Sequence, residues 1–286
     1  MFKIHNEIFC LTISKLGAEL EELCVNGINI LWKRSAIWNG QSPILFPIVG
    51  NLKDGYYIYN EQKYEMAAHG FLKDVLFEPV KVEQSLITLK SAYTEDTFNQ
   101  YPFQYEFYIT YALVSNKIKI KFEIKNLEEK TMFFSCGFHP GFDLEQVERL
   151  LGKNLYLEFS PLQVQSVQFN PQFTEKISSC NLPSQKTLTE FSQDLAIQKT
   201  VCYQGLNQIH LSGEDNSLRI NHNLDYTAFW QKNPDPKFIC IEPWSGLPDE
   251  EFTDHQLIHK KSIQALEARK TFEYEIELSF LEGVKK

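Results

Sequence analysis

Two short stretches each set one titratable side chain directly before a proline and among aromatic and glycine residues. The first, SCGFHPGF, carries His139, and the second, CIEPWSGLPD, carries Glu242. An imidazole titrates near neutral pH and can donate a proton. A carboxylate at the end of an apolar strand can have its pKa raised toward that of a useful base. If the fold brings the two residues together, their types predict a general acid and a general base.

Each of these residues also has a structural interpretation. His139 could be a buried histidine bonded to a backbone carbonyl, and Glu242 could be a salt-bridged carboxylate at a sheet rim. Trp244 offers a flat apolar face of the kind on which sugar rings stack. His69, in AAHGFLKD, precedes a glycine and marks either a close backbone approach or a tight turn. The loop at residues 43–60, PILFPIVGNLKDGYYIYN, contains an Asp-Gly turn and carries no chemistry by itself.

Several other kinds of site lose support. HQLIH has the spacing of two metal ligands on a helix, but it lacks the glutamate of H-E-x-x-H and an evident third ligand, so we interpret it as a solvated segment. The sequence has no G-x-S-x-G, P-loop or G-x-G-x-x-G motif, which argues against serine hydrolases of that kind, P-loop nucleotide hydrolysis and Rossmann dehydrogenases. A glycosidase with paired carboxylates stays an alternative, although no second acidic residue occupies a comparable setting.

The elements that must position these side chains are predicted to be strands. KIKIKFEIK alternates polar and apolar residues without a break, which indicates a strand with one buried face in an antiparallel sheet. The next segment, KTMFFSC, is expected to be its hairpin partner. Similar segments separated by turn residues predict further strands at Ser85–Tyr93, Tyr105–Leu113, Asn154–Phe159, Gln208–Ser212, Ser217–Asn221, Lys237–Glu242 and Thr271–Phe280.

Helical pattern is scarce, and only Asp143–Leu151 and Glu250–Lys260 are candidates. No Gly/Ser-rich linker, charge block or fixed-period repeat divides the chain. We therefore expect residues 1–286 to form a single domain, an all-β, large and twisted antiparallel sandwich.

The net charge of −9 argues against a nucleic-acid partner and against an anionic membrane surface, because both need clustered lysine and arginine. The six cysteines are scattered, with no C-x-x-C pair, and several lie inside apolar runs. The opening residues MFKIHNEIFCLTISK lack the pattern of a signal peptide, and no apolar run is long enough to span a bilayer. These features predict a reduced, cytoplasmic enzyme or binding protein.

Four stretches in order, GNLKDG, AAHGF, GFHPGF and CIEPWSGLPD, make the chain resemble the aldose 1-epimerase (galactose mutarotase-like) family, most closely its bacterial branch encoded beside lactose-utilisation genes. The similarity covers nearly the whole chain, from the GAEL motif in LTISKLGAELEEL onward. The resemblance implies a β-supersandwich that interconverts the α and β anomers of a free hexose without a metal or cofactor. It implies that His139 is the acid, that Glu242 is the base, and that His69 hydrogen-bonds the sugar near its ring oxygen.

The chain departs from the family pattern at two places. Relatives usually carry a sugar-binding arginine in the G-R-x-K-D-G loop, where this chain has Asn51, which can still bond a hydroxyl but lacks the charge and fork of arginine. The family also has an aspartate that holds distal hydroxyls, and Asp194 is the only aspartate in the stretch that covers that region.

Two other functions stay open from the residues alone. An epimerase of phosphorylated hexoses would need an arginine cluster, and none of the four arginines, Arg34 among them, lies in a predicted site loop, although Lys53 and Lys73 could act as point charges. A non-catalytic carbohydrate-binding or sensing protein is the alternative that Asn51 favours. We expect a small-molecule sugar substrate and a monomer or homodimer.

Overall fold

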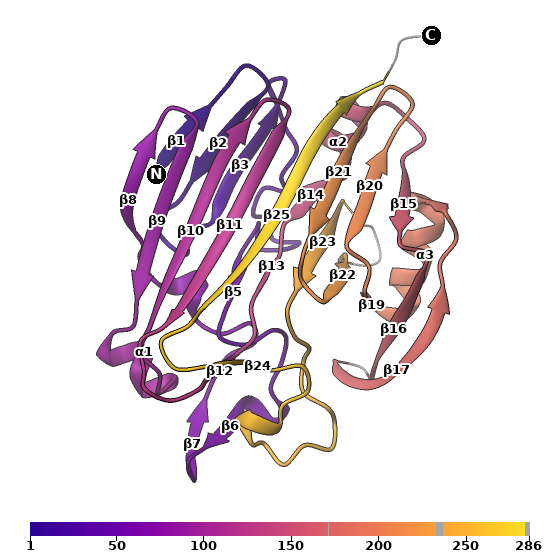
Figure 1. The fold of residues 1–286 in the computed structure, drawn as a ribbon. Helices are drawn as coiled ribbons and strands as arrows, with labels where there is room; N and C mark the ends of the chain where they lie inside the picture. The colour runs from indigo at the N-terminus through magenta and orange to yellow at the C-terminus, as the bar shows by residue number, and fades with distance from the viewer. Residues whose placement is uncertain (171, 233–236, 284–286) are drawn as a thin grey trace.

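The computed structural model describes residues 1–170, 172–232 and 237–283, which form mainly antiparallel strands in packed layers (Figure 1). The predicted all-β supersandwich is therefore confirmed. The largest layer is a nine-stranded sheet. From edge to edge its strands are β8 (Glu78–Glu83), β9 (Leu86–Ala92), β10 (Tyr105–Val114), β11 (Lys117–Asn126), β25 (Thr271–Glu282), β21 (Asn216–His222), β20 (Gln208–Ser212), β15 (Tyr156–Ser160) and β18 (Gln185–Thr187).

An eight-stranded sheet forms the second layer, behind the first in Figure 1. Its strands are β5 (Ile44–Leu45), β13 (Gly137–Phe138), β14 (Gly141–Asp143), β23 (Phe238–Trp244), β22 (Tyr226–Trp230), β19 (Thr200–Gln204), β16 (Gln163–Asn170) and β17 (Phe173–Asn181). Both β13 and β14 pair with β23, so His139 and Pro140, which connect them, lie against the strand that carries Glu242. This pairing brings the two predicted site motifs to one place.

Smaller sheets complete the fold. A four-stranded sheet contains β1 (Phe2–His5), β2 (Phe9–Ile13), β3 (Leu20–Val25) and β4 (Ile28–Asn29). Two strand pairs join β6 (Tyr56–Tyr59) to β7 (Gln62–Glu65) and β12 (Met132–Phe134) to β24 (Gln264–Leu266). The helices are α1 (Glu95–Gln100), α2 (Leu144–Leu151) and α3 (Leu188–Gln198), with 3₁₀ turns at Lys53–Gly55, Leu72–Asp74 and Leu257–His259. No helix in the described ranges is both long and apolar enough to cross a membrane.

The strand predicted from KIKIKFEIK is confirmed as β11, whose residues alternate between buried and half-buried positions. Its predicted hairpin partner is wrong. Strand β11 pairs with β10 on one edge and with β25 on the other, while Met132–Phe134 pairs with β24. Both edges of β11 are therefore occupied, and the following segment has no edge left to join.

One of the two helices expected from the sequence is present. In α2 the side chain of Asp143 accepts a hydrogen bond from the backbone N–H of Gln146, so Asp143 caps the helix. The expected helix at Glu250–Lys260 is wrong, because only Leu257–His259 makes a 3₁₀ turn there. Helix α3 was not predicted, although Thr187 and Glu190 form a capping box at its start.

Every residue of strand β23 is buried. Ile241 and Pro243 face the nine-stranded sheet, where they adjoin Ile118, Ile120 and Leu278 across a small internal gap. Successive side chains of a strand point to opposite faces. The even-numbered residues, Glu242 among them, therefore face away from the core between the two sheets.

Candidate active site

An open cleft of about 860 Å³ lies over the outward face of β23. Five of the seven predicted site residues line it, from four separate segments of the chain: Asn51, His69, His139, Glu242 and Trp244. The two stretches that we identified first, a hundred residues apart, thus contribute to one cavity.

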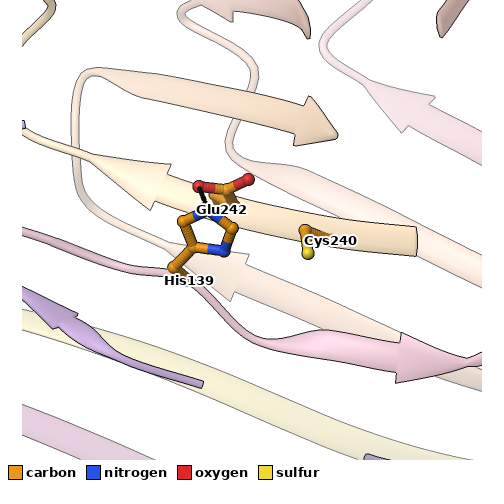
Figure 2. Close-up of side chains that lie close together, drawn as sticks. All are labelled: His139, Cys240 and Glu242. Carbon is orange, nitrogen blue, oxygen red and sulfur yellow. Dashed lines mark ion pairs between the residues drawn. The ribbon is translucent and has the colours of Figure 1, made fainter. Parts of the chain in front are cut away.

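His139 and Glu242 are in direct contact (Figure 2). Nε2 of His139 lies 3.1 Å from Oε2 of Glu242, and Nε1 of Trp244 donates a hydrogen bond of 3.1 Å to the same oxygen. The backbone N–H of His139 donates to the carbonyl of Pro43, which holds the β13–β14 connection in place. The acid and base candidates therefore lie side by side on neighbouring segments of one sheet.

The pair is enclosed by protein, and this decides its charge. Glu242 has no exposed surface and His139 is 8% exposed. Burial raises the pKa of Glu242 well above its usual range, and the hydrogen bond from Trp244 offsets part of that rise. Burial, and secondarily the neighbouring His69, lower the pKa of His139 well below its usual range. With the ring proton of His139 on Nδ1, one further proton between Nε2 and Oε2 leaves the pair without net charge, and burial favours this uncharged state.

His69 presents a defined hydrogen-bond donor to the cleft. The backbone N–H of Gly50 donates to its Nδ1 at 3.2 Å, so the proton of the neutral ring is on Nε2. Burial, with a smaller contribution from the charge of Lys73, lowers the pKa of His69 to about 4, which keeps the ring neutral at physiological pH. Its φ of 65° is uncommon for a residue other than glycine, and such backbone strain is found disproportionately at functional sites.

Two tryptophans that the sequence did not single out form an aromatic wall around His139. The ring centroids of Trp38 and Trp230 lie 5.2 and 6.0 Å from that of His139, and both tryptophans line the cleft. A Cβ at Gly141 would lie 2.7 Å from Trp38 Cζ3, and one at Gly40 only 2.4 Å from the same indole. The glycines in HPGF and WNG therefore leave room for Trp38, and they are the sequence signal from which it could have been found.

The remaining predicted residues lie in different settings. Asn51 lines the cleft, and its Nδ2 is 3.5 Å from Oε1 of Gln172. Lys53 is not among the lining residues, and its Nζ lies 5.0 Å from the ring centroid of Phe173. Asp194 lies on α3, where it forms an ion pair with Lys186 away from the cleft lining. Asn51 therefore lies at the site, whereas Lys53 and Asp194 lie outside the cleft lining.

Cys240 is a further neighbour of the catalytic candidates (Figure 2). One potential ligand atom each from His139, Cys240 and Glu242 lies within 4.8 Å of the others, so these residues could hold a metal ion. Burial, together with the nearby Glu242, raises the pKa of the Cys240 thiol well above its usual range, so the thiol is protonated at neutral pH. The histidines of HQLIH point to separate partners, because His255 stacks on Tyr56 and His259 bonds Asp254.

Known proteins share this architecture. Residues 1–264 match the model of the aldose 1-epimerase family. The LacX protein encoded on a plasmid of Lactococcus lactis subsp. lactis is 27% identical over 264 residues, which cover 86% of this chain and 87% of LacX. A galactose mutarotase related enzyme from Lactobacillus acidophilus superposes with a TM-score of 0.90 at 26% identity, covering 100% of this chain and 98% of that one. A galactose mutarotase-like protein from Lactobacillus casei has the same fold, with a TM-score of 0.87 at 24% identity over 98% and 99% of the two chains. The family match spans the cleft and its wall, and the chain belongs to the aldose 1-epimerase family.

Proposed function

We propose that this protein is an isomerase that interconverts the α and β anomers of a free hexose such as galactose or glucose. The observation that carries the proposal is the contact between His139 and Glu242 at 3.1 Å on the wall of an open cleft. Galactose is the first sugar to consider, because the solved relative from Lactobacillus acidophilus is described as a galactose mutarotase related enzyme.

The reaction needs one group that donates a proton and one that accepts it, close together. In a cyclic sugar the ring oxygen and the C1 hydroxyl oxygen are both bonded to C1, so Nε2 of His139 and Oε2 of Glu242 can contact both at once. With the shared proton on Nε2, His139 gives this proton to the ring oxygen while Oε2 of Glu242 takes the proton of the C1 hydroxyl. The bond between C1 and the ring oxygen breaks, and C1 becomes the carbonyl carbon of the open-chain aldehyde.

Closure reverses these roles. Rotation about the C1–C2 bond presents the other face of the carbonyl carbon to the former ring hydroxyl. That hydroxyl attacks C1 and loses its proton to His139, while Glu242 returns its proton to the new C1 hydroxyl. At the end of the cycle one proton is again shared between His139 and Glu242, so the reaction consumes no cosubstrate.

Other residues of the cleft are suited to hold the sugar during these steps. The Nε2 proton of neutral His69 provides a hydrogen bond near the ring oxygen. Oε1 of Glu242 has no hydrogen-bond partner among the described residues and can accept a hydrogen bond from a hydroxyl. Trp38 and Trp230 provide apolar faces beside His139 against which the C–H surface of a sugar ring can pack.

Polarimetry on freshly dissolved α-galactose and α-glucose tests the proposal. We expect wild type to accelerate equilibration over buffer, and Glu242→Gln to lose about 100- to 10,000-fold in rate, the range attributed to a general acid or base. Glu148→Gln on the exposed side of α2 is the matched control and should keep the wild-type rate. Wild-type equilibration no faster than buffer, for both sugars, would refute mutarotation of a free hexose.

A second candidate is an epimerase of phosphorylated hexoses, which one observation favours. Lys199 and Lys232 are exposed and line the cleft, so positive charge lies on part of its rim, while Lys73 is paired with Asp74. Galactose 6-phosphate and glucose 6-phosphate should then equilibrate faster than the free sugars. A Lys199→Gln variant should remove much of that preference while keeping the rate on free galactose.

A further inference from the structure

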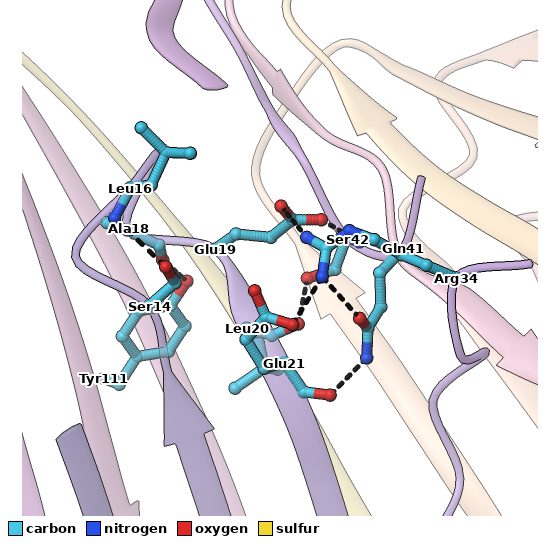
Figure 3. A network of polar contacts seen from close by, with 10 residues as sticks. All are labelled: Ser14, Leu16, Ala18, Glu19, Leu20, Glu21, Arg34, Gln41, Ser42 and Tyr111. Atoms are coloured by element: carbon cyan, nitrogen blue, oxygen red, sulfur yellow. Dashed lines mark hydrogen bonds and ion pairs between the residues drawn. The ribbon is translucent and has the colours of Figure 1, made fainter. Parts of the chain in front are cut away.

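The glutamate of the GAEL motif, Glu19, has no part in the acid–base pair, yet it lines the same cleft. It is 8% exposed and belongs to a polar network around Arg34 (Figure 3). Oε1 of Glu19 accepts a hydrogen bond of 2.9 Å from the backbone N–H of Ser42, and its Oε2 accepts one from Nη2 of Arg34. Nη1 of Arg34 donates to Glu21 at 2.5 Å and to Oε1 of Gln41 at 3.1 Å.

This network fixes the guanidinium but does not use all of its donors. Arg34 has five N–H groups. Those on Nη1 are taken by Glu21 and Gln41, and one on Nη2 is taken by Glu19. The Nε–H and one Nη2–H make no hydrogen bond within the described part of the chain, and the side chain is 34% exposed and lines the cleft. Two N–H groups on one planar guanidinium suit a pair of neighbouring oxygen acceptors.

The charge of the network indicates which acceptors these are. Two carboxylates, Glu19 and Glu21, face the single positive charge of Arg34. The cluster therefore carries excess negative charge, which disfavours an anionic group at this position. Neutral hydroxyl groups accept hydrogen bonds from a guanidinium without this repulsion. The cluster is thus suited to the hydroxyls of an uncharged sugar.

The loop of Arg34 also contacts the segment that carries the acid. The carbonyl of Gln41, whose side chain bonds Arg34, accepts the backbone N–H of Gly141, two residues from His139. Trp38, in the same loop, packs on the ring of His139. Arg34 and the acid–base pair therefore line one cleft and are joined by one loop.

We propose that Arg34, held by Glu19 and Glu21, hydrogen-bonds neighbouring hydroxyl groups of the sugar. Its charged guanidinium supplies the two-pronged contact that the side chain of Asn51 cannot make. This specificity role rests on the proposed action on a free hexose. It also assigns a task to the GAEL glutamate, which positions Arg34. If Arg34 only neutralised the buried Glu19, replacing Arg34 would lower the stability of the protein but would not change its affinity for the sugar.

Arg34→Lys separates the two interpretations, because lysine keeps the charge beside Glu19 but lacks the fork. We expect KM for galactose to rise about 10- to 100-fold with kcat changed less than about threefold, the scale of one or two lost hydrogen bonds to a charged group. Arg269→Lys, at an exposed pair with Glu129, is the matched control and should leave KM unchanged. An Arg34→Lys enzyme with wild-type KM would overturn the proposal.

Deoxy sugars make the test specific. Wild type should lose affinity for the galactose analogue that lacks the contacted hydroxyl, and Arg34→Lys should show no further loss on that analogue. Equal losses in both proteins for every deoxy position would refute the contact.

Sugar binding followed by tryptophan fluorescence in the Glu242→Gln background distinguishes failure of this inference from failure of the proposed function. Binding that weakens with Arg34→Lys supports the contact even without turnover. Undetectable binding of any neutral hexose by the Glu242→Gln protein and by wild type would overturn both proposals.

Discussion

The hydrogen bond from Trp244 to Glu242 leads to a prediction that tests how the base is tuned. Trp244→Phe removes the indole N–H that lies 3.1 Å from Oε2, while an aromatic ring remains at a position that is only 4% exposed. A hydrogen bond to a charged group contributes about 1.5–3 kcal/mol. If this stabilisation of the carboxylate is lost, the tenfold change per 1.36 kcal/mol translates into a kcat lower by about 10- to 100-fold.

The same change should alter the pH dependence in a defined direction. The indole N–H lowers the pKa of Glu242 against the effect of burial, so its removal raises that pKa further. The carboxylate then forms only at higher pH, and the acidic limb of the kcat profile should move to higher pH. Polarimetric initial rates on α-galactose from pH 4 to 9 measure both effects.

Trp230→Phe is the matched control, because Trp230 lies on the cleft wall near His139 and has no hydrogen bond to Glu242 among the described contacts. It should leave the acidic limb in place. A Trp244→Phe enzyme with wild-type kcat and an unmoved limb would refute the tuning role. A rise in KM alone would instead support the sugar-stacking face predicted from the sequence.

Two further predictions concern the surroundings of the pair. Gly141→Ala would bring a Cβ within 2.7 Å of Trp38 Cζ3. We therefore expect a displaced Trp38 ring, altered tryptophan fluorescence and a loss of about 1–3 kcal/mol in the free energy of unfolding. Gly27→Ala, whose added Cβ would have no atom within 4 Å, should leave the fluorescence unchanged. For His69, the folded-state pKa of about 4 lies below the ordinary value of 6.5, so the unfolded chain binds more protons than the folded chain between these two pH values. The stability that the neutral His69 ring contributes is therefore complete above pH 6.5 and is lost as the pH falls toward 4. The difference corresponds to roughly 3 kcal/mol, and chemical denaturation should show that His69→Gln removes this part of the pH dependence, while an identical pH dependence in both proteins would contradict it.

Much of the fold follows from local patterns. The alternation in Lys117–Asn126 reflects one buried face of a strand, and this strand is found where it was expected. The run FICI, which directly precedes Glu242, likewise forms part of β23, where every residue is buried. The helix expected at Glu250–Lys260 failed because that segment packs as an irregular loop, while α3 was overlooked despite its capping box at Thr187 and Glu190.

The pairing of strands that are distant in the chain could not be predicted from the sequence. The edges of β11 are taken by β10, its neighbour in the chain, and by β25, which begins at Thr271, so the segment after β11 pairs elsewhere. Which edge a strand joins depends on the packing of the whole sandwich, and local periodicity holds no information about it.

The candidate site divides in the same way. The sequence alone determined that His139 and Glu242 suit acid–base chemistry, because proline, glycine and aromatic neighbours along the chain mark constrained, apolar settings. Only the tertiary structure decided that the two side chains meet at 3.1 Å, that Lys53 and Asp194 lie outside the cleft lining, and that Arg34 lies on its wall. The physical reason is that residue type and spacing act over a few neighbours, whereas a cleft is made by segments that meet only after the sheets have paired and packed.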